Sequence, residues 1–442
     1  MLWSFAKEDI TPPAGLWQDG FANRAHPSDG VLDPLMVRAA AVKSGSNAFL
    51  FLAVEALVLT NDRAEGIRRR VANGCGVGRH QVMVAATHTH GAPMSMPTEH
   101  EEEYEQWWET LTGKAVVAAV RAVESLKPAR FDVAAGLSRI GINRREFTEK
   151  GVMIGENPKA VFDKSLRALR VTGEDGKLTG VILQGACHPV CMREKNTKYT
   201  GDWPGRACRI LEERNEGAVF LYFNGGCGDV NPKRYAGESD GECLERTVCT
   251  FLEDAERLLK KPFEAHDDGE IACADSVFDV PLVKPKRDGL VEDLEEWRKR
   301  MSLAPDDSWD KIIGIYCGRF TENALKHMEE HRPYVMPSTL QAVRLAGDVT
   351  FFGLPFETFS ATSKGLAHSL GELGMGKESV FTVGYANGIN GYLPTARAMR
   401  EGGYEPKTSA WFYNLPSYYS PRAEREVRNR LLALWEETGT ME

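Results

Sequence analysis

Two histidines directly follow a short apolar run, and their spacing could support metal chemistry. The run Val82–Ala86 continues into Thr87-His88-Thr89-His90-Gly91. Because alternate residues of an extended backbone point the same way, we expect both imidazoles to face one side at the end of a strand. Neutral imidazole is the commonest metal ligand in proteins, so His88 and His90 could provide half of a zinc site.

Similar polar side chains stand just past other apolar runs. His188, Asp229 and Glu357 follow, in order, the predicted buried strands Leu178–Ala186, Ala218–Phe223 and Val349–Leu354. Open α/β sheets place their chemistry just beyond the carboxyl ends of their strands. The sequence therefore predicts that these side chains meet the two histidines at one edge of a sheet.

The composition excludes several classes of partner. The chain has 442 residues, 42% hydrophobic and 26% charged, as in ordinary globular proteins. Its formal net charge of −9 argues against nucleic acid or an anionic membrane surface as the main partner. Charged residues begin at Lys7, and no apolar run reaches about 18 residues, so we expect a cytoplasmic protein without a signal peptide or stable membrane anchor. The nine cysteines form no Cys-x-x-Cys pair, which favours reduced thiols.

The pattern of segments predicts an α/β fold. Apolar runs at Met36–Val42 and Ala48–Val54 indicate strands, and Asn61–Ala72 indicates a helix with Asn61 as its N-cap. A strand at Ser379–Tyr385 is expected to open into a glycine-rich loop that continues to Glu405. With no linker in the chain, we expect residues 1–442 to form a single large domain, in which helices flank a mixed, twisted β-sheet and the active site lies at strand ends.

Seven short segments carry a family resemblance. They are Thr87-His88-Thr89-His90, Asn143-Arg144, His188-Pro189, Gly228-Asp229-Val230-Asn231-Pro232, Leu354-Pro355-Phe356-Glu357, Gly391-Tyr392-Leu393-Pro394-Thr395 and Gly403-Tyr404-Glu405. In order and spacing the chain resembles the catalytic N-terminal domain of the neutral/alkaline (non-lysosomal) ceramidases, a family of zinc amidohydrolases. The resemblance implies a Zn²⁺ ion bound by His88, His188, Glu357 and Tyr392. It also implies that His90 carries protons, and that Arg144 and Tyr404 stabilise the oxyanion of the scissile carbonyl.

The chain departs from the ceramidases at one chemically important position. Where the family carries a serine, this chain has Asn231, and an asparagine side chain can donate hydrogen bonds but cannot act as a nucleophile. We therefore expect zinc-bound hydroxide to attack directly, without an acyl-enzyme, while Asn231 orients water or substrate. The chain also ends in a predicted helix where ceramidases carry an immunoglobulin-like domain. These departures favour a small-molecule substrate, a soluble amide, ester or lactone.

Alternatives remain open at this stage. The protein could be a ceramidase or N-acyl-lipid amidase, or a non-catalytic relative that binds metal and ligand. Taken one at a time, His188 could be a core histidine, Glu357 a carboxylate at a helix start and Asp229 a turn residue. Arg144 could be an ordinary surface residue, and Tyr392 and Tyr404 ordinary loop residues. The metallo-β-lactamase pattern His-x-His-x-Asp-His is absent, and the strands before His88 disfavour a TIM-barrel amidohydrolase. The oligomeric state is not indicated by the sequence.

Overall fold

A large mixed β-sheet forms the centre of the protein in this computed structural model. The structure describes residues 1–96, 101–262, 265–266, 269–305 and 308–439. The sheet has eight strands in the order β13-β11-β10-β6-β1-β3-β4-β5. Their bounds are β1 Leu2–Asp9, β3 Met36–Ser44, β4 Asn47–Val54, β5 Val82–Ala86, β6 Lys127–Leu137, β10 Ser165–Gly173, β11 Leu178–Gly185 and β13 Val219–Asn224. β4 pairs with β5 and β11 pairs with β13 in parallel, while the other neighbours are antiparallel.

A second sheet packs face to face on the first. Its four strands, in the order β15-β16-β17-β19, are Ile271–Pro281, Val335–Leu345, Val349–Gly353 and Val380–Val383. Alternate residues of β4 explain the arrangement: Phe51 points into the layer between the sheets, where its ring lies 4.7 Å from that of Phe351, and Leu50 points to the opposite face. Since both faces are covered, β4 is a continuous apolar run rather than an alternating one.

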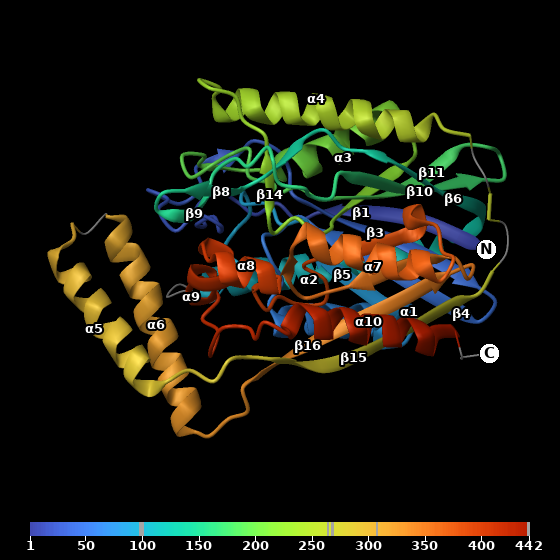
Figure 1. Cartoon of the computed structure of the whole chain (residues 1–442). Helices are drawn as coiled ribbons and strands as arrows, with labels where there is room; N and C mark the ends of the chain where they lie inside the picture. The colour runs from blue at the N-terminus through green and yellow to red at the C-terminus, as the bar shows by residue number, and fades with distance from the viewer. Residues whose placement is uncertain (97–100, 263–264, 267–268, 306–307, 440–442) are drawn as a thin grey trace.

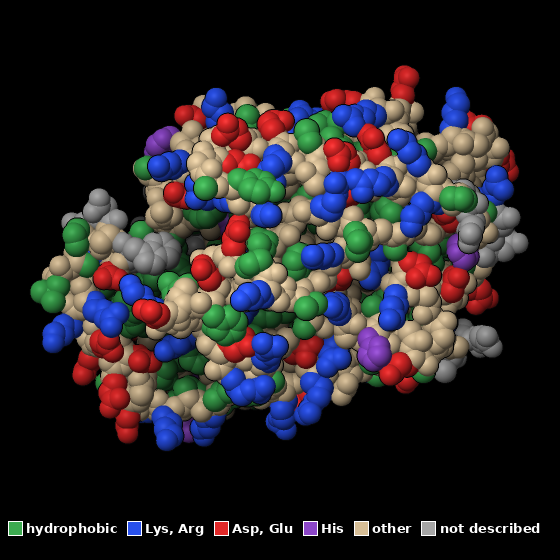
Figure 2. All heavy atoms as spheres, turned by 45° about the horizontal axis from the view of Figure 1, so that its top comes forward, with side chains coloured by type: hydrophobic (Ala, Val, Ile, Leu, Met, Phe, Trp, Pro, Cys, Tyr) green, Lys and Arg blue, Asp and Glu red, His purple; other side chains and the backbone are tan. Residues whose placement is uncertain are grey.

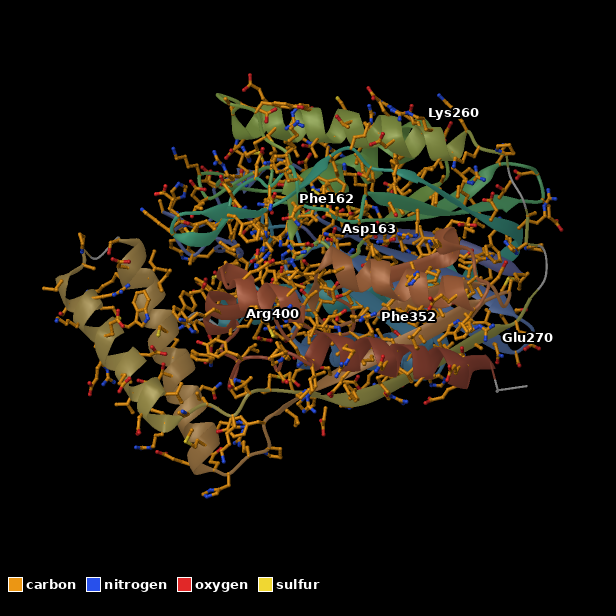
Figure 3. The ribbon with its side chains drawn as sticks, in the orientation of Figure 1. Phe162, Asp163, Lys260, Glu270, Phe352 and Arg400 are labelled. Atoms are coloured by element: carbon orange, nitrogen blue, oxygen red, sulfur yellow. The ribbon has the colours of Figure 1, made fainter. Side chains whose placement is uncertain are left out.

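Helices cover the two outer faces and complete four layers. On the large sheet lie α1 (Asn61–Cys75), α2 (Glu101–Glu124), α3 (Asp202–Arg214) and α4 (Asp240–Leu259), and on the small sheet lie α7 (Ser360–Glu372) and α10 (Ala423–Gly439). Figure 1 shows α4 and α10 on opposite sides of the molecule. Phe352 of β17 is fully buried and lies beneath α7 and α10 (Figure 3).

Two further helices form a hairpin that projects from the body. They are α5 (Arg287–Leu303) and α6 (Trp309–Glu329), seen at the left of Figure 1. The hairpin rests on α9 (Ser409–Phe412), where the Trp297 and Trp411 rings are 5.6 Å apart and the Tyr316 and Phe412 rings 4.6 Å apart. Among the described residues, no helix is both long and apolar enough to cross a membrane.

The surface carries both signs of charge. Figure 2 shows Lys and Arg side chains interspersed with Asp and Glu over the visible face. On that face the described residues therefore form no basic stripe of the kind that tracks a nucleic-acid backbone.

Several local predictions need correction. The N-cap of α1 is Thr60, whose side chain accepts from the Arg63 backbone N–H, while the Asn61 side chain bonds to the distant Ile389 and Asn390. The glycine-rich segment before Glu405 is not a plain loop, because it contains α8 (Ala396–Glu401) and the start of a π-helix, Tyr404–Thr408. Strand β1 was not predicted, although it lies in the middle of the large sheet.

Candidate active site

The carboxyl ends of strands from both sheets deliver the predicted ligand residues to one place. His88 lies two residues past β5, and His188 lies three residues past β11. Glu357 and Tyr392 begin the short strands β18 (Glu357–Thr358) and β20 (Tyr392–Leu393), which pair in parallel with these two residues opposite each other. The strand-end pattern predicts the meeting of His88, His188 and Glu357, whereas Tyr392 was expected there only from the family resemblance, and the ligand roles of all four stay predictions.

The way the two spaced histidines meet differs from the prediction. Strand β5 ends at Ala86, and His88 has a left-handed backbone with φ 70°. Such a conformation costs about 1–3 kcal/mol for a residue other than glycine and persists only where the surroundings impose it. The loop, rather than an extended strand, brings the His88 and His90 rings to 5.0 Å from each other.

Hydrogen bonds fix the orientation of two imidazoles. His88 Nδ1 lies 2.9 Å from the backbone carbonyl oxygen of Leu57, and His188 Nδ1 lies 2.7 Å from that of Cys227. A carbonyl can only accept, so each Nδ1 carries the proton and each Nε2 presents a lone pair. Both Nε2 atoms face Glu357 Oε2, at 3.2 Å from His88 and 3.1 Å from His188.

This donor set suits a divalent cation. His88, His188, Glu357 and Tyr392 are all at most 5% exposed, and the Tyr392 hydroxyl lies 3.3 Å from His188 Nε2. Burial, together with the charge of Arg144, lowers the pKa of His188 to about 4. Lone pairs converging on an ionised carboxylate are the arrangement expected of borderline metal ligands.

His90 completes a cluster of three imidazoles. One ligand atom from each of His88, His90 and His188 lies within 4.8 Å of the others, a grouping that could hold a metal ion. Both ring nitrogens of His90 are buried, and neither has a hydrogen-bond partner among the residues that the structure describes. Its backbone carbonyl accepts from Arg24 Nη2 at 2.5 Å, and a Cβ at Gly20 would lie only 2.2 Å from its Nδ1. Burial and the two neighbouring histidines lower the pKa of His90 well below its usual value, which favours a neutral ring.

Arg144 contacts the same cluster, with its Nη1 at 3.2 Å from His188 Nε2. Its Nη2 donates to the Tyr392 hydroxyl at 2.8 Å, its Nε donates to Glu405 Oε1 at 2.9 Å, and its Nη1 donates to Asn231 Oδ1 at 3.3 Å. The guanidinium also lies 6.0 Å from the centre of the Tyr404 ring. Burial by itself would lower the pKa of Arg144. The interactions with Tyr392 and Glu405 outweigh burial and raise that pKa well above its usual value, so the side chain is a permanent cation at the site.

Asp229 has a different role from the other strand-end residues. Its carboxylate accepts from the Ser360 backbone N–H at 2.8 Å and from the Asn143 side chain at 3.1 Å. It therefore stabilises the start of α7, which is the turn and helix-start role of an aspartate rather than that of a ligand.

Comparison with known proteins places this chain in a family. The family model described as neutral/alkaline non-lysosomal ceramidase, N-terminal, matches residues 3–260. The chain belongs to this family. A crystal structure of the neutral ceramidase from Pseudomonas aeruginosa is similar with a TM-score of 0.76 and 17% identity, covering 98% of this chain and 73% of that one. A ceramidase complexed with C2 gives a TM-score of 0.72 at 17% identity, covering 98% and 74%. At this identity the likeness shows a shared fold.

The ceramidase family is hydrolytic, so this chain is a ceramidase-type hydrolase with a possible histidine metal site. All eight residues assigned from the sequence lie in or beside the histidine cluster: His88, His90, Arg144, His188, Asn231, Glu357, Tyr392 and Tyr404. Their individual roles stay predictions.

Sequence reasoning missed three residues that contact this ceramidase-type site. Tyr385 and Tyr413 both donate hydroxyl hydrogen bonds to Glu357, and Glu405 accepts from both Arg144 and Arg145. Glu405 belongs to one of the recognised family segments, so that segment offered a signal. The two tyrosines belong to no such segment, and only the tertiary structure identifies them.

Proposed function

We propose that this ceramidase-type hydrolase cleaves the amide bond of an N-acylated lipid, with a zinc ion bound by His88, His188, Glu357 and Tyr392. The observation that carries the proposal is the convergence of two oriented Nε2 lone pairs on one oxygen of Glu357. Membership of the family favours the ceramidase alternative over the small soluble substrate expected from the sequence.

A zinc ion held there would supply Lewis acidity, which lowers the pKa of water and polarises a carbonyl oxygen. The protein groups then have separate tasks. Arg144 and Tyr404 lie where they can donate to a carbonyl oxygen as it gains negative charge. His90 has a lowered pKa that favours a neutral ring, and in the described part of the chain its ring nitrogens have no hydrogen-bond partner, so it can take the proton of the attacking water and return it to the leaving amine.

The residue at position 231 decides the course of hydrolysis. Asn231 has no ionisable side chain, so we propose that water itself adds to the carbonyl carbon, forming the new C–O bond, and that the C–N bond then breaks as the amine takes up a proton. The products are a free carboxylic acid and an amine, with no acyl group on the protein. The bond from Arg144 to Asn231 Oδ1 supports an orienting role for the asparagine amide.

Metal analysis combined with turnover tests the proposal. Wild-type protein should contain zinc, and His88→Ala and His188→Ala should lose it while remaining folded, since a core of this size does not depend on a metal. His368→Ala is the matched control, because His368 is exposed and pairs with Glu372 in its own helix. Wild-type zinc content in both site variants would refute the metal assignment.

The substrate is tested separately with the same preparations. A series of N-acyl-sphingosines in detergent should be hydrolysed faster than short, water-soluble amides, esters and lactones of matched leaving group. Faster turnover of the soluble compounds would restore the alternative of a small substrate. Zinc binding with no turnover of any compound would indicate a non-catalytic relative.

A further inference from the structure

Both oxygens of Glu357 are held by tyrosine hydroxyls. The Tyr385 hydroxyl donates to Oε2 at 3.2 Å, and the Tyr413 hydroxyl donates to Oε1. Oε2 is also the oxygen that faces the Nε2 atoms of His88 and His188. The two oxygens therefore differ in surroundings, because Oε2 faces the imidazoles and Oε1 faces only a phenol among the contacts of this carboxylate in the described structure.

Tyr385 contacts two of the proposed ligands at once. Its ring stacks on that of His88, with centroids 4.2 Å apart and planes at 22°, while its hydroxyl reaches Glu357 and lies 3.0 Å from Cys227 Sγ. The residue is completely buried and has a φ of 55°, which is a genuine outlier for a bulky side chain. Backbone bonds from Ala86 N to its carbonyl and from its own N–H to Phe356 O impose this conformation.

Tyr413 reaches Glu357 from a different part of the chain. It directly follows α9, and its ring lies against Gly391, where an added Cβ would be 3.1 Å from Tyr413 Cδ2. Gly391 has a φ of 76°, and its carbonyl accepts from the Glu357 backbone N–H at 3.0 Å. The Tyr413 side chain is therefore packed against the backbone that also fixes Glu357.

We propose that Tyr385 and Tyr413 are positioning residues that make Glu357 bind the metal through Oε2 alone. A carboxylate can ligate through one or two oxygens, and a hydrogen bond to Oε1 disfavours the two-oxygen mode. Tyr385 additionally fixes the separation between Glu357 and His88, because one rigid ring contacts both. Hydrogen bonds of this kind orient ligands and raise metal affinity. The inference rests on the proposed zinc site and assigns two residues that contact its ligands without ligating the ion.

The test removes each hydroxyl and keeps each ring. Zinc affinity of Tyr385→Phe and Tyr413→Phe is measured by competition with a chromophoric chelator, starting from metal-free protein. Each should bind zinc about 10–100-fold more weakly than wild type, the usual effect of losing such a partner. Tyr419→Phe is the matched control and should bind as wild type, because the buried Tyr419 hydroxyl donates to the backbone carbonyl of Asn390, which is not a proposed ligand.

A spectroscopic measurement separates positioning from a general loss of stability. In the cobalt-substituted Tyr413→Phe protein, release of Oε1 should raise the coordination number, so visible absorption should weaken relative to wild type and Tyr419→Phe. If Tyr385→Phe is poorly folded, Tyr413→Phe alone decides the outcome. Wild-type zinc affinity together with an unchanged cobalt spectrum would overturn the inference. Wild-type zinc content in His88→Ala and His188→Ala would instead refute the metal site itself.

Discussion

His90 differs from its two neighbouring histidines, because no described residue forms a hydrogen bond with either of its ring nitrogens. If it carries protons and does not ligate the metal, His90→Ala should retain zinc and lose turnover by about 10²–10⁴-fold. Zinc content and steady-state kinetics on the same preparation check this. A loss of zinc as complete as in His88→Ala would show that all three clustered imidazoles are ligands.

Substitutions of Asn231 test whether hydrolysis forms a covalent acyl-enzyme. Its amide oxygen accepts from Arg144, so Asn231→Ala should leave the Arg144 guanidinium less well oriented and lower turnover by about 10²-fold at most, no more than the loss of an oxyanion donor itself. Asn231→Ser should not create an acyl-enzyme. In a rapid-quench experiment with an activated ester, neither wild type nor Asn231→Ser should give a product burst, and solvent ¹⁸O should enter the acid. Acyl group trapped on wild-type protein would contradict direct attack by water.

At the scale of elements, the π-helix Tyr404–Thr408 is joined to β8 (Arg145–Thr148) through one carboxylate. Glu405 is 3% exposed and accepts from Arg144 Nε at 2.9 Å and from Arg145 Nη1 at 2.5 Å. Glu405→Ala leaves two buried guanidinium groups without this partner, so unfolding free energy should fall by about 3–5 kcal/mol. Urea unfolding provides the measurement.

Glu401→Ala is the control for that comparison. Its carboxylate lies 3.5 Å from Arg145 Nη2 and its side chain is 21% exposed, so its loss should cost about 1 kcal/mol or less. Equal effects of the two substitutions would mean that Glu405 does not anchor the π-helix.

The elements that could be predicted are those whose own residues determine them. β4 is apolar throughout because both of its faces are buried, so its sequence alone identifies it. β1 was missed because Lys7 and Glu8 interrupt its apolar pattern, and both are neutralised by partners distant in sequence. Helix α8 and the π-helix depend on bonds from Arg145, which the local sequence does not reveal.

The same distinction applies to the candidate site. His88, His188 and Glu357 could be predicted because a ligand-type residue directly follows an apolar strand. Tyr392 and Tyr404 came from the family resemblance, since a tyrosine in a loop carries no signal of its own. Tyr385 depends on a left-handed backbone held by β5 and Phe356, and such a contact cannot be inferred from residue types.

For the whole molecule, we propose that the described residues form one domain. The two sheets share a common interior, in which Phe51 of the large sheet contacts both Phe223 and Phe351. Neither sheet could separate without exposing this layer to water. Urea unfolding followed by far-UV and near-UV circular dichroism should therefore give coincident transitions. Two separate transitions would indicate independent domains.

A buried charge network links the large sheet to its outer helices and makes stability depend on pH. Glu212 of α3 accepts from Lys7 Nζ of β1 at 2.6 Å and from Arg38 Nε of β3 at 2.8 Å. Burial would raise the pKa of Glu212, but the charge and hydrogen bonds of Arg38, with those of Lys7, outweigh it and lower that pKa below its usual value. The folded protein therefore holds this carboxylate ionised at a pH where the unfolded chain has begun to bind a proton.

A group with a depressed pKa stabilises the fold above the pKa of the unfolded chain and loses that contribution as the pH falls through its folded pKa. Wild type should exceed Glu212→Gln in unfolding free energy by about 3–5 kcal/mol at neutral pH, because the substitution leaves a buried cation short of a partner. The difference should shrink as the pH falls below the pKa of an unfolded glutamate, about 4.3, and through the lower pKa of folded Glu212, where wild-type Glu212 itself becomes protonated. Glu109→Gln, which removes an exposed pair with Arg70, should differ little from wild type throughout. Urea unfolding across this range measures both series, and a Glu212 difference that stays constant with pH would show that the network does not hold the carboxylate ionised.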